Sequence, residues 1–412
     1  MKWLLALCLA AACGAASAAT AIIHAHAFTM AGAGEVQDAT VIIDDGRVVS
    51  VTAHGPAPAG ARVIDAGGRV VTPGLISAAT QLGLAEVSLA ADTDDRAVSS
   101  GPLGAAFDVD YAFNANSVLL PVARADGLTR ALIYPGMGAG PFSGQAAMIR
   151  LIPPGGTVER SRAAEFAVTG QAIASKVGGS RAAAWGLIRN ALGEARRLGE
   201  GKLDPRARLN SLPDLEALQP VIAGTIPLVI QADRASDLRQ AIDLARDEKV
   251  RVVILGGAEA WSLATELAAA KIPVILDPQA DMPQTYDQIG ARYDNAALLA
   301  KAGVPIAFQV SGNGVYLSYN VGEAIRWGAG MAVANGLPYQ EALAAITSAP
   351  AAIFGFPTGA GTLAPGADAD VVIWDGDPLE PASAPTAVFV GGEPAPLITR
   401  QTLLRDRYAP RR

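Results

Sequence analysis

The middle of the chain alternates continuous apolar runs with segments of helical periodicity, and this alternation constrains the fold more than any other feature. Apolar runs such as residues 252–255 fit parallel strands that are buried on both faces of a sheet. Between such runs, residues 235–248 and 259–271 repeat apolar side chains at helical spacing. This repetition predicts an α/β fold, either a (β/α)8 barrel or a doubly wound sheet.

Seven strands are clear in this region, and an eighth is placed near residues 166–168. The seven expected strands are residues 70–76, 128–134, 146–152, 226–231, 250–255, 272–276 and 304–310. A chain of 412 residues has room for one large α/β domain and a small second one.

Both ends of the chain show β-patterns, and no helical period appears before residue 70. Near the N-terminus, Asp45-Gly46 separates two β-branched runs, which is a strong hairpin signal. The C-terminal strands have no local partner, so we expect them to pair with the N-terminal ones. The expected units are a composite β-sandwich of residues 19–70 plus 356–400, a barrel of residues 71–355, and a basic tail of residues 401–412.

Residues 1–18 have the pattern of an export signal. Lys2 precedes an apolar stretch that is too short to span a bilayer, and Ala16-Ser17-Ala18 provides a small-residue cleavage site. Both cysteines, Cys8 and Cys13, lie inside this leader. Cleavage after Ala18 would leave a mature chain without disulfides, which we expect in the periplasm or outside the cell. The net charge of −7 argues against a nucleic-acid partner.

Five segments resemble the amidohydrolase superfamily, especially its exported imidazolonepropionase-like and prolidase-like members. They occur in the family's order through most of the mature chain, at residues 42–48, 71–76, 345–351, 361–372 and 374–379. The resemblance implies a (β/α)8 TIM barrel with a composite β-sandwich, and hydrolysis of carbon–nitrogen bonds other than peptide bonds. It also implies one or two divalent metals, commonly zinc, bound by histidines after strands one, five and six and by an aspartate after strand eight.

The family's metal ligands are missing when the chain is read position by position. Ala79 and Gln81 stand in the two strand-one histidine positions, Gln231 stands in the strand-five position, and Ser311 stands at the aspartate. None of these four side chains replaces imidazole or carboxylate as a zinc ligand. We therefore predict no metal cofactor and a neutral pocket lined by these residues. Lys176, the one lysine in place to bridge two metals, is flanked by a predicted loop.

Carboxylates near strand ends remain as candidate catalytic groups. Asp233, Glu259, Asp277 and Asp281 have this position, and a pair of them is able to run general acid–base chemistry. The alternative is structural: an Asp233–Arg234 ion pair and a helix-capping role for Glu259. His24-Ala25-His26 lies outside the barrel and supplies too few ligands for zinc.

Two loops offer weaker signals. Residues 136–144 are glycine-rich but lack the Gly-Lys-Ser/Thr of a phosphate loop, so we expect a flexible loop over the barrel mouth. The acidic run of residues 92–95 lacks the other features of a calcium loop, so we expect it to be solvated.

Three functions follow from these observations. The first is an inactive amidohydrolase-type subunit that partners an intact paralogue. The second is a periplasmic binding protein that holds a small molecule in the neutral pocket. The third is a metal-independent hydrolase using Asp233, Glu259 or Asp277. An oligomer with a paralogue, or with itself, is the expected partner for the first function.

Overall fold

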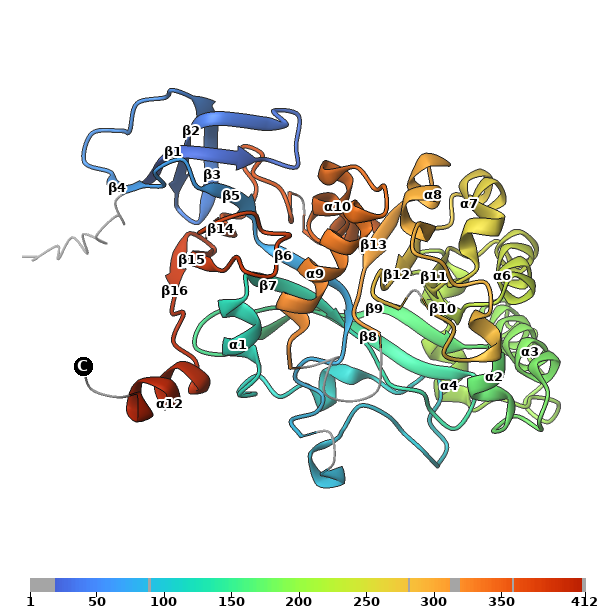
Figure 1. The fold of residues 1–412 in the computed structure, drawn as a ribbon. Coiled ribbons are helices and arrows are strands. Elements are labelled where there is room, and N and C mark those ends of the chain that lie inside the picture. Colours follow the sequence, from blue (N-terminus) through green and yellow to red (C-terminus); the bar gives the residue numbers. More distant parts are fainter. Residues whose placement is uncertain (1–18, 88–89, 281, 312–318, 358, 410–412) are drawn as a thin grey trace, which may run out of the picture.

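The protein builds two separate β-sheets, shown in a computed structural model (Figure 1). The structure describes residues 19–87, 90–280, 282–311, 319–357 and 359–409. Sheet A lies at the upper left of Figure 1, and sheet B with its covering helices forms the larger body. The expected export signal, residues 1–18, lies outside the described residues.

Sheet A combines strands from both ends of the chain, as predicted. The two ends meet where β14 pairs antiparallel with β5, with Val372 opposite Thr72. Asp45 and Gly46 both have positive φ angles, 46° and 71°, in the tight turn between β2 and β3. Its strands in spatial order are β16 (Glu393–Ala395), β15 (Pro385–Val390), β14 (Val371–Trp374), β5 (Val70–Pro73), β1 (Thr20–Phe28), β2 (Glu35–Asp44) and β3 (Arg47–Ala53), with β4 (Arg62–Asp65) beside β1.

Sheet B is an eight-stranded sheet that curls into a nearly closed barrel. Its two edge strands, β6 and β13, contact each other. The eighth strand expected near residues 166–168 exists as the end of β9. The strands in order are β6 (Leu75–Thr80), β7 (Leu128–Ile133), β8 (Phe142–Arg150), β9 (Thr157–Val168), β10 (Leu228–Ala232), β11 (Val252–Gly256), β12 (Val274–Leu276) and β13 (Ile306–Phe308).

Strand β8 differs from a regular (β/α)8 barrel because it runs antiparallel to both of its neighbours, β7 and β9. The connections on its two sides, residues 134–141 and 151–156, contain no helix. A parallel crossover needs a dozen or more residues, so connections this short return the chain as hairpins. The remaining neighbouring pairs in the sheet are parallel.

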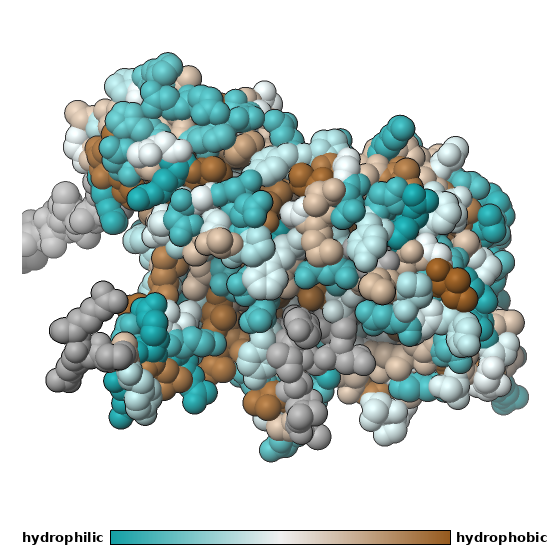
Figure 2. Space-filling model, viewed as in Figure 1, coloured by the Kyte–Doolittle hydropathy of each residue, from teal (hydrophilic) through white to brown (hydrophobic). Residues whose placement is uncertain are grey.

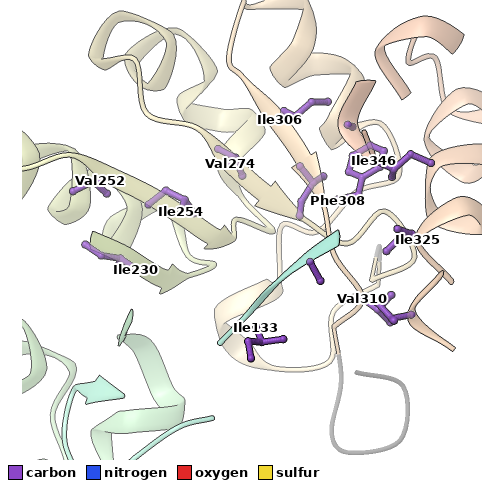
Figure 3. Close-up of a cluster of buried hydrophobic side chains, with 14 of the residues drawn as sticks. Ile133, Ile230, Val252, Ile254, Val274, Ile306, Phe308, Val310, Ile325 and Ile346 are labelled. Atoms are coloured by element: carbon purple, nitrogen blue, oxygen red, sulfur yellow. The ribbon is translucent and has the colours of Figure 1, made fainter. Parts of the chain in front are cut away.

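Helices cover the outer face of sheet B, and the main apolar core lies between the two layers. Side chains such as Ile230, Ile254 and Phe308 point into this core (Figure 3). Alternate residues such as Val229 and Ala307 fill the barrel interior. The helices are α1 (Leu120–Ala125), α2 (Gly170–Ala174), α3 (Arg181–Gly199), α4 (Leu212–Ala217), α5 (Gln219–Ile222), α6 (Ala235–Glu248), α7 (Ala264–Ala270), α8 (Asn295–Lys301), α9 (Val321–Ala334), α10 (Tyr339–Ala345) and α11 (Ser348–Phe354).

A buried group of charged side chains joins the barrel to sheet A, and we call it the arginine network. Arg130 of β7 contacts Asp368 and Asp370, which precede β14, and its Nε donates to Glu159 of β9 at 3.0 Å. Arg150 of β8 donates to Asp370 at 2.6 Å. Every charged group in the network therefore faces at least one opposite charge, as burial of ions requires.

The C-terminal segment ends in helix α12 (Arg400–Tyr408), which contains no buried residue. The helix projects from the body at the lower left of Figure 1. On the face shown in Figure 2, hydrophilic residues cover most of the sheet A module. Within the described part of the chain, none of the helices has the length and apolar character needed to cross a membrane.

Candidate functional site

The carboxyl ends of the parallel strands of sheet B meet at one mouth of the barrel, where polar side chains gather. Gln81 follows β6, Gln231 lies at the end of β10, Asp277 follows β12, and Ser311 lies beyond β13. Gln231 points inward because Val229, two residues earlier, fills the barrel interior. This mouth is the expected place for a site in a barrel of this type.

The larger cavity at this mouth, the mouth cavity, has a volume of about 560 Å³. Its wall combines aromatic rings with neutral hydrogen-bonding groups. Tyr134 stacks on Phe166 with ring centroids 4.9 Å apart. The residues that line the cavity include Gln81, Asp94, Arg96, Tyr134, Ser143 and Gln231.

Arg96 sits on the wall of the mouth cavity, and its charge is already compensated. Its Nε donates to Asp94 at 2.7 Å, and its Nη1 donates to Gln81 Oε1 at 2.8 Å. The Arg96 hydrogen bond also holds the pKa of Asp94 below its usual value. The acidic run of residues 92–95 was expected to be solvated; instead Asp94 is half-buried and fixes an arginine at the mouth.

A smaller cavity of about 120 Å³, the side cavity, adjoins the mouth cavity. Tyr134 and Gln231 line both cavities, so the two form neighbouring lobes of one site. Two of the candidate catalytic carboxylates, Asp233 and Asp277, line the side cavity together with Ser311. The structure thus places these two carboxylates on the wall of one cavity, and Ser311 reaches it from beyond β13, the strand next to β12.

Among the described residues, only neutral groups donate to the two carboxylates of the side cavity. Asp233 accepts from the Ala258 backbone N–H and from Gln288 Nε2, each at 3.1 Å. Asp277 accepts from the Ser311 backbone N–H at 2.7 Å and from its hydroxyl at 2.8 Å. Burial raises the pKa of both carboxyls, although these hydrogen bonds act in the opposite direction.

The predicted ion pair between Asp233 and Arg234 is wrong. Arg234 instead donates to Asp237, three residues later, at 3.1 Å. The side chain of Asp233 turns away from α6 toward Gln288 and the side cavity. Asp237 lies in the first turn of α6, three residues after the N-cap Arg234, and this i, i+3 spacing brings the two side chains together.

Glu259 has a structural position, and it holds two loops together. Its Oε2 accepts from the Ala235 backbone N–H at the start of α6, and its Oε1 accepts from the Gly290 backbone N–H. The carboxylate of Glu259 therefore accepts a hydrogen bond from a free N–H group at the start of α6, and not from the short helix of Ala260–Leu263 that follows it. Asp281, the fourth carboxylate considered, lies outside the described residues.

The remaining candidate positions lie apart from the cavities. Ala79 is fully buried in the cluster that fills the barrel interior and is not among the residues that line either cavity. Lys176 is exposed after α2 and donates to the Gly138 carbonyl at 2.8 Å, which ties down the glycine-rich loop. His24 and His26 of β1 contact Asp65 and Glu35 in sheet A.

The side chains at the mouth do not fit the divalent metal that the resemblance implies. Gln81 Oε1 accepts from a guanidinium, and Ser311 donates its hydroxyl to Asp277. Across the described residues, no three His, Cys, Asp or Glu side chains come together in a way that could hold a metal ion. All three histidines of the sequence precede residue 55. The described residues therefore offer no ligand set for a metal-activated water at the mouth.

Two buried polar atoms at the cavities have no hydrogen-bond partner. They are the hydroxyl of Ser143, in the wall of the mouth cavity, and Oε1 of Gln309, in the wall of the side cavity. Buried polar groups without partners are rare in folded proteins because each costs free energy. Sequence reasoning missed both residues, although Gln309 alternates with Ser311 and so shares its inward direction.

Comparisons with known proteins agree with this architecture. The amidohydrolase family profile matches residues 236–399. An amidohydrolase from Hapsidospora irregularis, tasK, is 47% identical over 57 residues, which cover 14% of this chain and 6% of that protein. The structure of an amidohydrolase from Thermotoga maritima matches with a TM-score of 0.80 and 23% identity, over 91% of this chain and 99% of that one.

A second solved structure, a prolidase complexed with N-methylphosphonate-L-proline, matches over 91% of this chain and 99% of its own with a TM-score of 0.53 and 18% identity. Likeness at these identities establishes the fold. The family profile supports the resemblance to the amidohydrolase superfamily over residues 236–399, and the solved structures confirm the predicted fold.

Proposed function

We propose that this amidohydrolase-fold protein binds a small molecule at the barrel mouth without a metal. The observation that carries the proposal is the two-lobed cavity, which opens where the family's metal would lie and is lined by Gln81, Gln231 and Ser311. Ligand sites typically combine an apolar wall with a few convergent polar groups. Here the Tyr134–Phe166 stack supplies the apolar wall.

The unpartnered hydroxyl of Ser143 supports this proposal. A buried polar group without a partner costs about 1–3 kcal/mol. A ligand that hydrogen-bonds to Ser143 would recover that free energy, and Gln231 is exposed at the same cavity to take part. The neutral groups suit a ligand that carries both hydrogen-bond donors and acceptors.

The test is a thermal-unfolding screen of untagged protein against small polar compounds, with metal content measured on the same preparation. A specific ligand at 100 times its Kd stabilises the fold by about 2.7 kcal/mol. We expect a saturable shift that Ser143→Ala and Gln231→Ala weaken and that Gln401→Ala, on the exposed helix α12, leaves unchanged. A full equivalent of metal per chain, or shifts that ignore both cavity variants, would overturn the proposal.

A second candidate function is that of a partner subunit of an intact amidohydrolase paralogue. Three apolar side chains beside the side cavity, Met282, Tyr286 and Ile289, are each more than half exposed. Exposed apolar groups that cluster in one segment mark interaction surfaces. Co-expression with a paralogue should give a stable complex that Ile289→Ser weakens and that Leu209→Ser, an equally exposed position, does not. Two separate monomers in light scattering would contradict it.

A metal-independent hydrolase is the third candidate, and the shared position of Asp233 and Asp277 favours it. Burial raises the pKa of both groups, as general acid–base chemistry near neutral pH requires. Glu259 is a weaker candidate because both of its oxygens hold backbone N–H groups. Activity that survives chelator but is lost in Asp277→Asn, and retained in Asp243→Asn on the surface of α6, would support this candidate.

We also propose export to the periplasm or the medium, on the sequence of residues 1–18 alone. N-terminal sequencing of protein recovered from the periplasmic fraction should then begin at Ala19. Recovery of the full chain, starting at Met1, in the cytoplasmic fraction would contradict the proposal.

A further inference from the structure

The two lobes of the site differ in charge. In the mouth cavity, the charge of Arg96 is balanced by Asp94. The side cavity holds Asp233 and Asp277, and within the described part of the chain neither carboxylate accepts a hydrogen bond from a lysine or arginine. Arg292 also lines this lobe, but it pairs with Asp294 and lies over the Trp261 ring at 4.7 Å. The side cavity therefore carries excess negative charge.

The side cavity also contains a buried acceptor without a donor. Gln309 is 5% exposed, and its Oε1 has no hydrogen-bond partner. Ala307 fills the barrel interior, whereas Phe308 and Val310 pack in the outer core, so Gln309 points inward at the mouth. Two carboxylates and an amide oxygen then face one small space, and each of them accepts hydrogen bonds.

We infer that the side cavity binds the protonated primary amine of a small ligand, whose remaining part lies in the mouth cavity. This inference rests on the proposed binding function and names its ligand class. An ammonium group has three donors and no acceptor, which complements Asp233, Asp277 and Gln309. The cavity volume of about 120 Å³ suits an amine with a few carbon atoms, given that a water molecule occupies about 30 Å³ in the liquid.

The electrostatics of the carboxylates agree with an ammonium ligand. Burial raises the pKa of both Asp233 and Asp277, because their charged forms lose hydration in the cavity and face no cation there among the described residues. An ammonium group would stabilise the charged carboxylates and lower those pKa values. Binding should therefore tighten as pH rises through the carboxyl pKa values, and weaken again near pH 10, where an alkyl amine loses its proton.

The test measures binding of butylammonium to the full protein by calorimetry at constant ionic strength. Three probes of similar size separate charge from shape: butylammonium, 1-butanol, and tetramethylammonium, which has charge but no N–H donor. We expect saturable binding of butylammonium alone. Asp277→Asn should weaken it roughly tenfold or more, because charge-assisted hydrogen bonds are the strong ones. Asp243→Asn on the surface of α6 should have no effect.

A second variant keeps both carboxylates and guards against misfolding. Gln309→Leu removes only the unpartnered acceptor, and it should weaken butylammonium binding several-fold while circular dichroism stays unchanged. Equal binding of butylammonium and 1-butanol, or binding that Asp277→Asn and Gln309→Leu leave intact, would overturn the inference. Binding of neutral ligands through Ser143 would then still support the proposed function. If no compound binds at either lobe, both the inference and the proposed function are wrong.

Discussion

The arginine network buries carboxylates beside cations, whereas the barrel mouth holds two half-buried carboxylates without any among the described residues. In the network, Asp370 faces Arg130 and Arg150, and Arg47 adds a third cation at Asp368. At the mouth, Asp233 and Asp277 receive only neutral donors. Burial of a carboxylate alone therefore does not identify a ligand-binding site. A carboxylate with its cation present supports the fold, whereas one without a cation, facing a cavity, has bonding capacity for a ligand.

The largest expected effect comes from breaking the network. Arg130→Met leaves Asp368, Asp370 and Glu159 short of a buried cation, which should cost about 3–5 kcal/mol of unfolding free energy. Denaturant titration followed by circular dichroism measures the loss. Arg47→Met is the matched control, because Arg47 is 56% exposed and its pair with Asp368 should contribute less than about 1 kcal/mol. Equal losses of unfolding free energy in both variants would contradict the expected difference between a buried and an exposed arginine.

Asp126 offers the next largest effect, with a pH dependence of known sign. Burial, and then repulsion from Glu323, raises its pKa from 3.8 to about 7. The folded state therefore favours the protonated form of Asp126. The contribution of this form to the free energy of unfolding is fully present below about pH 4 and is lost as pH rises through 7. Asp126→Asn should leave stability unchanged near pH 4 and increase it by about 2–4 kcal/mol at pH 8, given 1.36 kcal/mol per pKa unit. Unfolding curves at the two pH values test this, and a variant that is less stable at pH 8 would refute it.

Glu165 of β9 tests whether a buried carboxyl without a cation affects the stability of the fold without affecting ligand binding. It is fully buried, both carboxyl oxygens lack partners, and burial raises its pKa well above the usual value. It packs on the outer face of the sheet beside Leu228 and does not line either cavity. Glu165→Gln should raise stability at pH 8 by about 1–2 kcal/mol, with a smaller gain at pH 5, and leave calorimetric ligand binding unchanged. Altered binding would show that the two properties are not separable.

The sequence predicted the fold through its ordered motifs and the pairing of its two ends, but not the direction of one strand. The reversal of β8 follows from the short connection of residues 134–141, a length that the sequence already contains. The alternation of apolar runs shows where strands lie, but it is the same for parallel and antiparallel neighbours. Only the length of the connection indicates the direction of the strand.

The candidate site was predictable where it depends on strand ends. Gln231 lies near the end of a strand, Asp277 and Ser311 follow strands, and the structure brings all three to one cavity. Arg96 and Tyr134 were missed for different reasons. Arg96 reaches the mouth from an irregular segment without periodicity, and its role depends on contacts with Asp94 and Gln81 that no local pattern encodes. Tyr134 is the last residue of a predicted strand, and its aromatic side chain gave no reason to separate it from the core.

The smallest expected change in stability is at the mouth itself, where it should be opposite in sign to the loss in the network. Asp277→Asn removes a half-buried charge that has no cation, so the ligand-free fold should gain about 0.5–1 kcal/mol at pH 8. The same variant should lose most of its affinity for butylammonium. Thermal unfolding with and without that ligand measures both effects on one protein. A variant that is destabilised without ligand would place Asp277 with the network, as a residue that holds the fold, and the distinction between the two regions would fail.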